Sequence, residues 1–78
     1  MEIDVRGKTL DEAISVVDKF LDDSAMASLH SVTIIHGKGT GVLRQGIGDY
    51  LRRHPLVEEY RIGKYGEGEN GVTVVTLK

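Results

Sequence analysis

The stretch "SVTIIHGKGTGVLR" (residues 31–44) passes from an apolar, β-branched segment through three glycines, at every second position, into a helical pattern. Residues 31–36 form a short and nearly continuous apolar run, which is typical of a strand that is buried or central in a sheet. From residue 40 to residue 54 the apolar side chains fall on one face of a helix, and Pro55 ends it. The stretch therefore predicts a strand, a tight glycine loop and a helix in direct succession.

A strand and a helix also precede this stretch. Ile3 and Val5 alternate with charged residues, which predicts a strand that ends at Gly7. Thr9 and Glu12 have the spacing of a capping box, and apolar residues at helical spacing follow them. The chain is thus predicted to open with a strand and an amphipathic helix.

Two further strands are predicted over residues 57–65 and 72–78, and "GEGENG" (residues 66–71) joins them as a hairpin loop. The predicted order is strand, helix, strand, helix, strand, strand. Right-handed crossovers make the first three strands parallel, and the hairpin adds one antiparallel strand. We therefore predict an α/β fold of the α+β two-layer sandwich kind, with a mostly parallel four-stranded sheet and two helices.

The predicted topology brings three loops together. The carboxyl ends of parallel strands share one edge of a sheet, and open α/β sheets bind ligands at that edge. We therefore expect "DVRG" (residues 4–7), "HGKGTG" (residues 36–41) and "GEGENG" to lie close together.

Composition and charge narrow the functional classes. The 78 residues suffice for one domain, and the lack of cysteine excludes disulfides and thiolate metal sites. The lack of cysteine also suits the reducing cytoplasm, where we expect the protein to be. No apolar run approaches the roughly 20 residues of a membrane span. Residues 1–30 carry three Lys/Arg against seven Asp/Glu, whereas residues 31–78 carry seven against five. The glycine loop lies in the positive part, which favours an anionic ligand.

The glycine loop is a candidate phosphate site, because backbone N–H groups and the helix dipole favour an anion where a helix follows a strand. Its spacing fits neither a Walker loop nor a dinucleotide fingerprint, which would need a glycine at Val42. A tight turn without a ligand is the plainer alternative. Lys38 and Arg44, which can both reach a phosphate oxygen, favour phosphate. The predicted phosphate-binding residues are Gly37, Lys38, Gly39, Thr40, Gly41 and Arg44.

Three residues beside this loop, Asp4, Arg6 and His36, are candidates for phosphodiester cleavage. Asp4 and Arg6 point to the same side of the first strand, where Asp4 would position or deprotonate the attacking oxygen and Arg6 would stabilise the phosphate charge. His36 would protonate the leaving oxygen, since histidine titrates near neutrality. The structural alternatives are a surface ion pair for the first two and a buried, hydrogen-bonded histidine for the third.

A divalent metal ion, Mg²⁺ or Mn²⁺, is the one cofactor that the sequence leaves open. Glu67 and Glu69 in the last loop are candidates to bind it together with Asp4. Solvated glutamates in a glycine-rich turn are the alternative.

Three segments, "IDVRG" (residues 3–7), "HGKGTGVLR" (36–44) and "GENGVTVVTL" (68–77), resemble in order and spacing the motifs of the Smr (small MutS-related) domain. The resemblance covers essentially the whole chain. "LRQGIGDYLRRHPLVEEYRIG" (43–63) is especially similar to the Smr domain that ends the second bacterial MutS paralogue, a recombination suppressor. We therefore expect residues 1–78 to be a single Smr domain and the C-terminal module of a longer protein.

The resemblance implies a fold like the C-terminal domain of translation initiation factor three, and an endonuclease activity that nicks DNA. It also implies association with ribosomes, and relatives of the domain cleave RNA. The acidic and basic positions of the first motif fall on Asp4 and Arg6. Many relatives have histidine at the position of Arg6, and an arginine there is better suited to binding a phosphate than to acid–base chemistry. The third motif usually opens with paired glycines, whereas here Glu69 follows Gly68.

The sequence supports two functional hypotheses. The first is an endonuclease domain that cuts phosphodiesters at the loop edge, with Asp4 and His36 as the acid–base pair. The second is a non-catalytic module that binds the backbone of DNA or ribosomal RNA. The expected partners are DNA and either ribosomal RNA or the ribosome, and no membrane is expected. Dimers would form through the parent protein.

Overall fold

The computed structural model describes all 78 residues, and its elements follow the predicted order. In chain order they are β1 (Glu2–Asp4), α1 (Leu10–Met26), β2 (Ser31–Ile35), α2 (Val42–Arg52), β3 (Val57–Ile62), the 3-10 turn η1 (Glu69–Gly71) and β4 (Val72–Leu77). The predicted α+β fold with four strands and two helices is confirmed, and η1 is an addition to it. Neither helix has the length and apolar character needed to cross a membrane.

The sheet is mixed, with the strand order β1-β2-β4-β3. Strands β1 and β2 pair in parallel, and β4 is antiparallel to both of its neighbours, β2 and β3. Three of the four strands thus run in one direction, as predicted, but β4 is inserted between the second and the third. Its nearly uninterrupted β-branched sequence suits a strand that pairs on both sides, whereas the charged sequence of β3 suits an edge.

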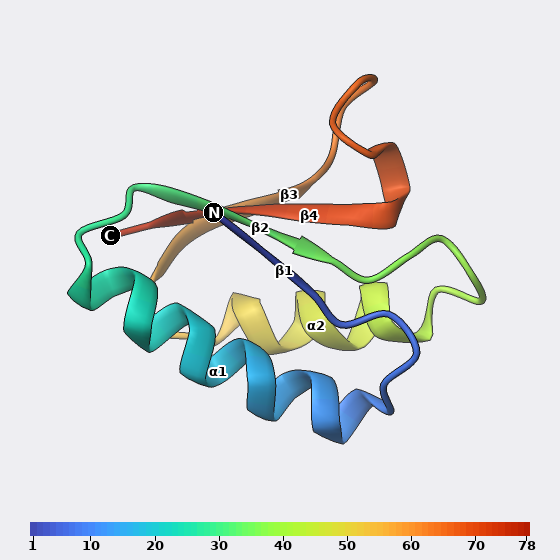
Figure 1. Cartoon of the computed structure of the whole chain (residues 1–78), viewed down its shortest axis with the longest axis horizontal. Coiled ribbons are helices and arrows are strands. Elements are labelled where there is room, and N and C mark those ends of the chain that lie inside the picture. Colours follow the sequence, from blue (N-terminus) through green and yellow to red (C-terminus); the bar gives the residue numbers. More distant parts are fainter.

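The molecule has two layers, because both helices cover the same face of the sheet and the opposite face is open (Figure 1). Side chains alternate along each strand, so Ile34 and Val75 point to the helices whereas their neighbours Thr33 and Val74 point to the open face. The buried core consists of Val5, Ala13, Val17, Leu21, Val32, Ile34, Ile47, Leu51, Val57, Val75 and Leu77.

Helix α1 begins at the predicted capping box. The hydroxyl of Thr9 accepts from the Glu12 N–H (3.2 Å), and Oε1 of Glu12 accepts from the Thr9 N–H (2.9 Å). The apolar stripe of the helix faces the sheet, with Val17 and Leu21 completely buried. Each such side chain contributes about 1.5–3 kcal/mol to the free energy of folding.

Gly46 lets the two helices approach each other closely. A Cβ at this position would lie 2.5 Å from both methyl carbons of Leu10 at the start of α1, which is closer than packed carbon atoms come. At Gly48 the Cβ would lie 3.7 Å from the Tyr60 ring of β3, an ordinary contact. The close approach at Gly46 is therefore between α2 and α1.

Alanine at these two glycines should therefore have opposite effects. Gly48→Ala should raise the free energy of unfolding by up to about 1 kcal/mol, because alanine is the better helix former and its methyl group fits. Gly46→Ala should lower it by about 1–3 kcal/mol, because the methyl group collides with Leu10. Urea unfolding followed by circular dichroism measures both changes, and equal stabilisation by both alanines would contradict the close approach.

Candidate functional site

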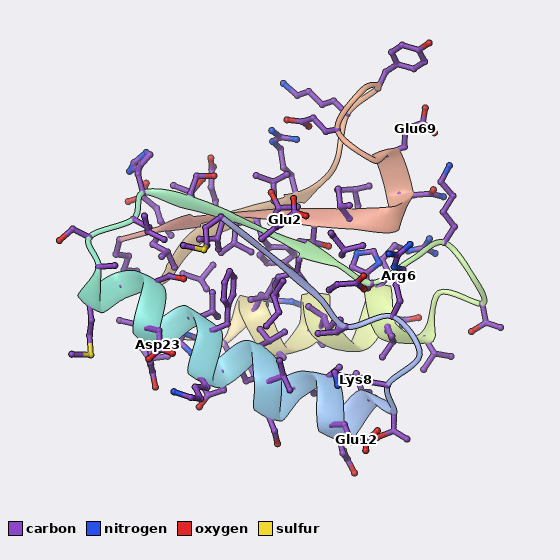
Figure 2. The ribbon with its side chains drawn as sticks, viewed as in Figure 1. Glu2, Arg6, Lys8, Glu12, Asp23 and Glu69 are labelled. Atoms are coloured by element: carbon purple, nitrogen blue, oxygen red, sulfur yellow. The ribbon has the colours of Figure 1, made fainter.

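Three loops meet at the carboxyl edge of the sheet, as the topology predicted. The carbonyl of Gly71 accepts hydrogen bonds from the N–H groups of His36 (3.1 Å) and Gly37 (2.9 Å), which joins the second loop to the third. The first loop reaches the same place, since a Cβ on Gly37 would lie 3.3 Å from Cγ of Arg6. Figure 2 shows Arg6 and Glu69 at this end of the molecule.

Asp4 and Arg6 form a bidentate ion pair on the surface. Arg6 donates from Nη2 to Oδ2 of Asp4 (2.7 Å) and from Nε to Oδ1 (3.0 Å), and its backbone N–H also donates to Oδ1 (3.0 Å). These hydrogen bonds lower the pKa of the Asp4 carboxyl to about 2. Asp4 is therefore ionised throughout the neutral pH range, with both of its oxygens directed at Arg6.

Lys38 of the glycine loop is paired with the third loop. Its Nζ donates to Oε2 of Glu69 at 3.2 Å, and both side chains are about half exposed. An exposed pair of this kind contributes about 0–1 kcal/mol to stability. Phosphate oxygens can therefore replace the carboxylate at little cost.

His36 is buried, and both of its ring nitrogens are engaged within the chain. Nδ1 lies 2.9 Å from the carbonyl oxygen of Gly37, and Nε2 lies 2.8 Å from the hydroxyl of Thr73, which is also buried. A carbonyl only accepts, so we assign a proton to Nδ1, which donates to Gly37, while Nε2 forms the second hydrogen bond with the Thr73 hydroxyl. His36 is thus placed as a buried, hydrogen-bonded histidine, the structural alternative to a role as an acid.

Asp4 and His36 lie on opposite faces of the sheet. Asp4 is in register with Ile35, and it shares the open face with Arg6. His36 follows Ile35 and points to the helix-covered face, where it meets Thr73. The alternation of side chains along β1 and β2 therefore separates the two residues that were predicted to act as an acid–base pair.

Two small cavities flank the glycine loop. One of them, about 270 Å³, is lined by Arg6, Lys38 and apolar side chains of β2 and β4 that belong to the open face. The other, about 280 Å³, lies on the helix side between residues 37–44 and the start of α1, and includes Lys8. Gly37 lines both cavities, so the loop forms a ridge between them. Sequence reasoning missed Lys8, because a single lysine before a helix is no signal until the glycine loop is placed beside it.

Helix α2 begins without a side-chain cap. Gly41 occupies the N-cap position in the left-handed conformation (φ +86°), and the Val42 N–H reaches only the Thr40 hydroxyl, at 3.4 Å. The N–H groups of Leu43 and Arg44 donate to no group of the chain. Free amides at a helix start favour an anion, which fits the phosphate-binding role predicted for this loop.

The carboxylate cluster predicted to bind a metal ion is not assembled. Both oxygens of Glu67 accept from Arg61 (2.8 and 3.1 Å), and Glu69 pairs with Lys38. No three His, Asp or Glu side chains of the chain lie close enough to hold one metal ion. The expected grouping of Asp4 with these two glutamates is therefore corrected, because the third loop engages its glutamates in ion pairs.

A larger cavity, about 750 Å³, lies between α1 and α2, but its charge is wrong for a phosphate. Asp18, Asp22 and Asp49 line it, and Arg53 is the only lysine or arginine among its lining residues. A hydrogen bond from the Tyr50 hydroxyl lowers the pKa of Asp18, which keeps that carboxylate charged. An anionic ligand is therefore expected at the glycine loop and not in this cavity.

Comparison with known proteins gives a family match over nearly the whole chain. The model of the Smr domain matches residues 3–78. "Endonuclease MutS2" of Caldicellulosiruptor bescii is 69% identical over all 78 residues, and "Endonuclease MutS2" of Clostridium novyi is 62% identical over 76 residues, or 97% of the chain. The chain covers 10% of each of these two proteins, so it spans about a tenth of their length.

Two solved structures share the fold. The Smr domain of Thermus thermophilus MutS2 superposes with a TM-score of 0.97 and is 45% identical, over 99% of this chain and 96% of that one. YdaL, a stand-alone small MutS-related protein from Escherichia coli, superposes with a TM-score of 0.92 over 99% of this chain and 63% of that one. At 23% identity, the second comparison shows a common fold alone.

Removal of the Arg6 side chain should raise the pKa of Asp4 toward that of an ordinary carboxyl group. The Asp4 carboxyl should titrate near pH 2 in the unmodified chain, because its pKa is about 2. In Arg6→Ala the midpoint should rise toward the value of about 4 of an unperturbed aspartate, and stay somewhat below it because the backbone N–H of residue 6 still donates to Oδ1. A carbon-detected NMR titration measures both midpoints. Arg61→Ala, which removes an arginine paired with Glu67, is the control and should leave Asp4 unchanged; a midpoint near 4 without any substitution would refute the ion pair.

The glycine loop should tolerate alanine at one glycine and not at another. Gly41→Ala should lower the free energy of unfolding by about 1–2 kcal/mol, because its φ is left-handed. The new Cβ would also lie 2.8 Å from Nη2 of Arg44. Gly39→Ala meets open space at an ordinary φ and should change stability by less than about 0.5 kcal/mol. Thermal unfolding compares the two variants, and similar losses in both would argue against the left-handed N-cap.

Proposed function

The chain belongs to the Smr domain family, as its three motifs indicated, and on this basis we propose that it binds the sugar–phosphate backbone of a nucleic acid and nicks it at the loop edge. The observation that carries the proposal is the open-face cavity, where Arg6, paired with Asp4, lies beside Lys38 of the glycine loop. A carboxylate and two cations are the groups that phosphodiester hydrolysis needs. The curated relatives bear the name endonuclease, which supports this reading.

Both cavities at the glycine loop suit a phosphate group better than a whole nucleotide. Their volumes of about 270 and 280 Å³ lie below the range typical of small-molecule sites, about 300–1,000 Å³. No phenylalanine, tyrosine or tryptophan lines either cavity, so neither offers a surface on which a base stacks. A strand whose phosphates enter the cavities, with its bases pointing away, fits this arrangement.

Binding of a phosphate to Arg6 would prepare Asp4 for its role. Arg6 holds the pKa of Asp4 at about 2, and a carboxylate with so low a pKa is a weak base. When phosphate oxygens occupy the guanidinium, Asp4 loses the hydrogen bonds from the Arg6 side chain and keeps the one from the Arg6 backbone N–H, so its pKa rises part of the way toward the ordinary value of about 4. Asp4 then accepts a proton from the attacking water.

The proposed reaction is an in-line hydrolysis at phosphorus. The water oxygen forms a bond to phosphorus while the bond from phosphorus to one sugar oxygen breaks, and Asp4 holds the proton that the water loses. Arg6 and Lys38 stabilise the negative charge that grows on the phosphate oxygens. The leaving oxygen takes a proton from the Lys38 ammonium or from solvent.

His36 acts in this scheme as a positioning residue. Its Nδ1–H donates to the carbonyl of Gly37 and its Nε2 meets the Thr73 hydroxyl, so the ring braces the glycine loop from the covered side of the sheet. This role replaces the acid role expected from the sequence, because the ring lies on the face opposite Asp4.

A binding module without catalysis is the second candidate, and two observations favour it. Asp4 is a weak base while Arg6 holds it, and the glutamates of the third loop are engaged with cations. In this case the loop edge would hold backbone phosphates of DNA or ribosomal RNA, and the domain would serve as one module of a longer protein.

Asp4→Asn should strongly slow the nicking of supercoiled plasmid and leave binding in place. Asparagine keeps the shape and one acceptor oxygen but takes no proton, so the rate should fall by about 10²-fold or more. A gel assay of the purified chain, with and without Mg²⁺ or Mn²⁺, measures the rate. The matched control is Asp23→Asn, which removes a carboxylate paired with Lys19 on α1 and should nick like the unmodified chain.

Either outcome of this assay is informative. Nicking by Asp4→Asn at the unmodified rate would remove Asp4 from the chemistry. If the unmodified chain binds plasmid and structured RNA but cuts neither, the binding module is the function.

A further inference from the structure

Four basic side chains surround the glycine loop, and they fall into two groups. Arg6 and Lys38, beside the open-face cavity, are each paired with a carboxylate. Lys8 and Arg44, on the helix side, form no salt bridge with any carboxylate of the chain. The positive charge that is free to bind an anion therefore lies on the helix side.

Lys8 and Arg44 line the same cavity of about 280 Å³. Arg44 is half-buried, and its guanidinium lies against the loop, since a Cβ on Gly41 would come within 2.8 Å of Nη2. Lys8 is exposed, and its flexible side chain can turn into the cavity. A half-buried guanidinium and an exposed ammonium thus face one hollow, and both can donate hydrogen bonds to the oxygens of one phosphate group.

No carboxylate lines this cavity. Glu12 is the acidic residue that interacts electrostatically with Lys8, because the charge of Lys8 contributes to the lowered pKa of Glu12. The two residues lie close together at the start of α1 (Figure 2). However, Oε1 of Glu12 already accepts from the N–H (2.9 Å) and the hydroxyl (3.1 Å) of Thr9 in the capping box. Two cations and no carboxylate line the cavity, so it keeps a net positive charge with Glu12 nearby, whereas the charges of the ion pairs beside the open-face cavity cancel.

We propose that Lys8 and Arg44 bind a second phosphate of the same strand, which crosses the ridge at Gly37 from the helix-side cavity to the open-face cavity. The inference rests on the proposed function and gives its site a second contact. The unpaired cations anchor the strand, because no carboxylate has to be displaced from them. The paired cations receive the phosphate that is cut, beside Asp4.

The salt dependence of binding tests this contact on the 78-residue chain. Fluorescence anisotropy with a short labelled DNA duplex gives Kd over a range of NaCl concentrations. Lys8→Gln and Arg44→Gln should each lower the slope of log Kd against log [NaCl] by up to about 1, the contribution of one lost phosphate contact. Lys8→Arg keeps the charge and should restore the slope.

The matched control is Lys78→Gln. Lys78 is also unpaired, but it follows β4 at the opposite edge of the sheet, where the Leu77 N–H donates to His30, so its loss should leave the slope unchanged. If the unmodified chain binds and Lys8→Gln keeps its slope, the second contact is overturned and the proposed function stands. If the unmodified chain binds neither duplex nor single strand, the proposed function itself is overturned. Circular dichroism confirms that each variant is folded.

Discussion

The carbonyl of Gly71 is the point on which the whole site depends. It accepts hydrogen bonds from the N–H groups of His36 and Gly37, and so fixes where the glycine loop leaves the sheet. The position of Gly71 is set in turn by β4, whose first residue, Val72, is in register with Ile35 of β2. Had β4 been added outside β3, Gly71 would lie one strand away from β2, and its carbonyl could not accept these two hydrogen bonds. The central place of β4 is therefore what assembles the site.

The order of the elements could be predicted because apolar periods, the capping box and the glycine turns are local signals. The place of β4 in the sheet could not be predicted, since it depends on which strand edges compete for pairing.

The face of the sheet on which His36 lies could have been derived from the sequence. Val32 and Ile34 alternate with Thr33, a pattern that already puts His36 on the apolar side of its strand. The face of Asp4 could be derived in the same way, so the separation of the two residues was within reach of the sequence.

The ion-pair partners of the charged side chains could not be predicted from the sequence. Glu67 was predicted to face a metal ion, but it pairs with Arg61 six residues away, across a turn whose conformation no local pattern specifies. Lys8 became a candidate only when the fold placed the glycine loop beside the start of α1. Exposed ion pairs are weak, so the choice among several possible partners rests on loop geometry, which is the least predictable feature of a chain.

Under the proposed function, the ion pairs beside the open-face cavity make the site selective for a polymer. A free phosphate ion gains little there, because it must displace Asp4 or Glu69 from a cation that is already neutralised. A phosphate in a strand that is already held by Lys8 and Arg44 arrives at a high local concentration, without any stronger contact of its own. The same displacement removes the side-chain hydrogen bonds from Arg6, the largest cause of the low pKa of Asp4, so the base gains strength only when a strand is in place. Anchoring on one face of the sheet and chemistry on the other are in this way coupled through the ridge at Gly37.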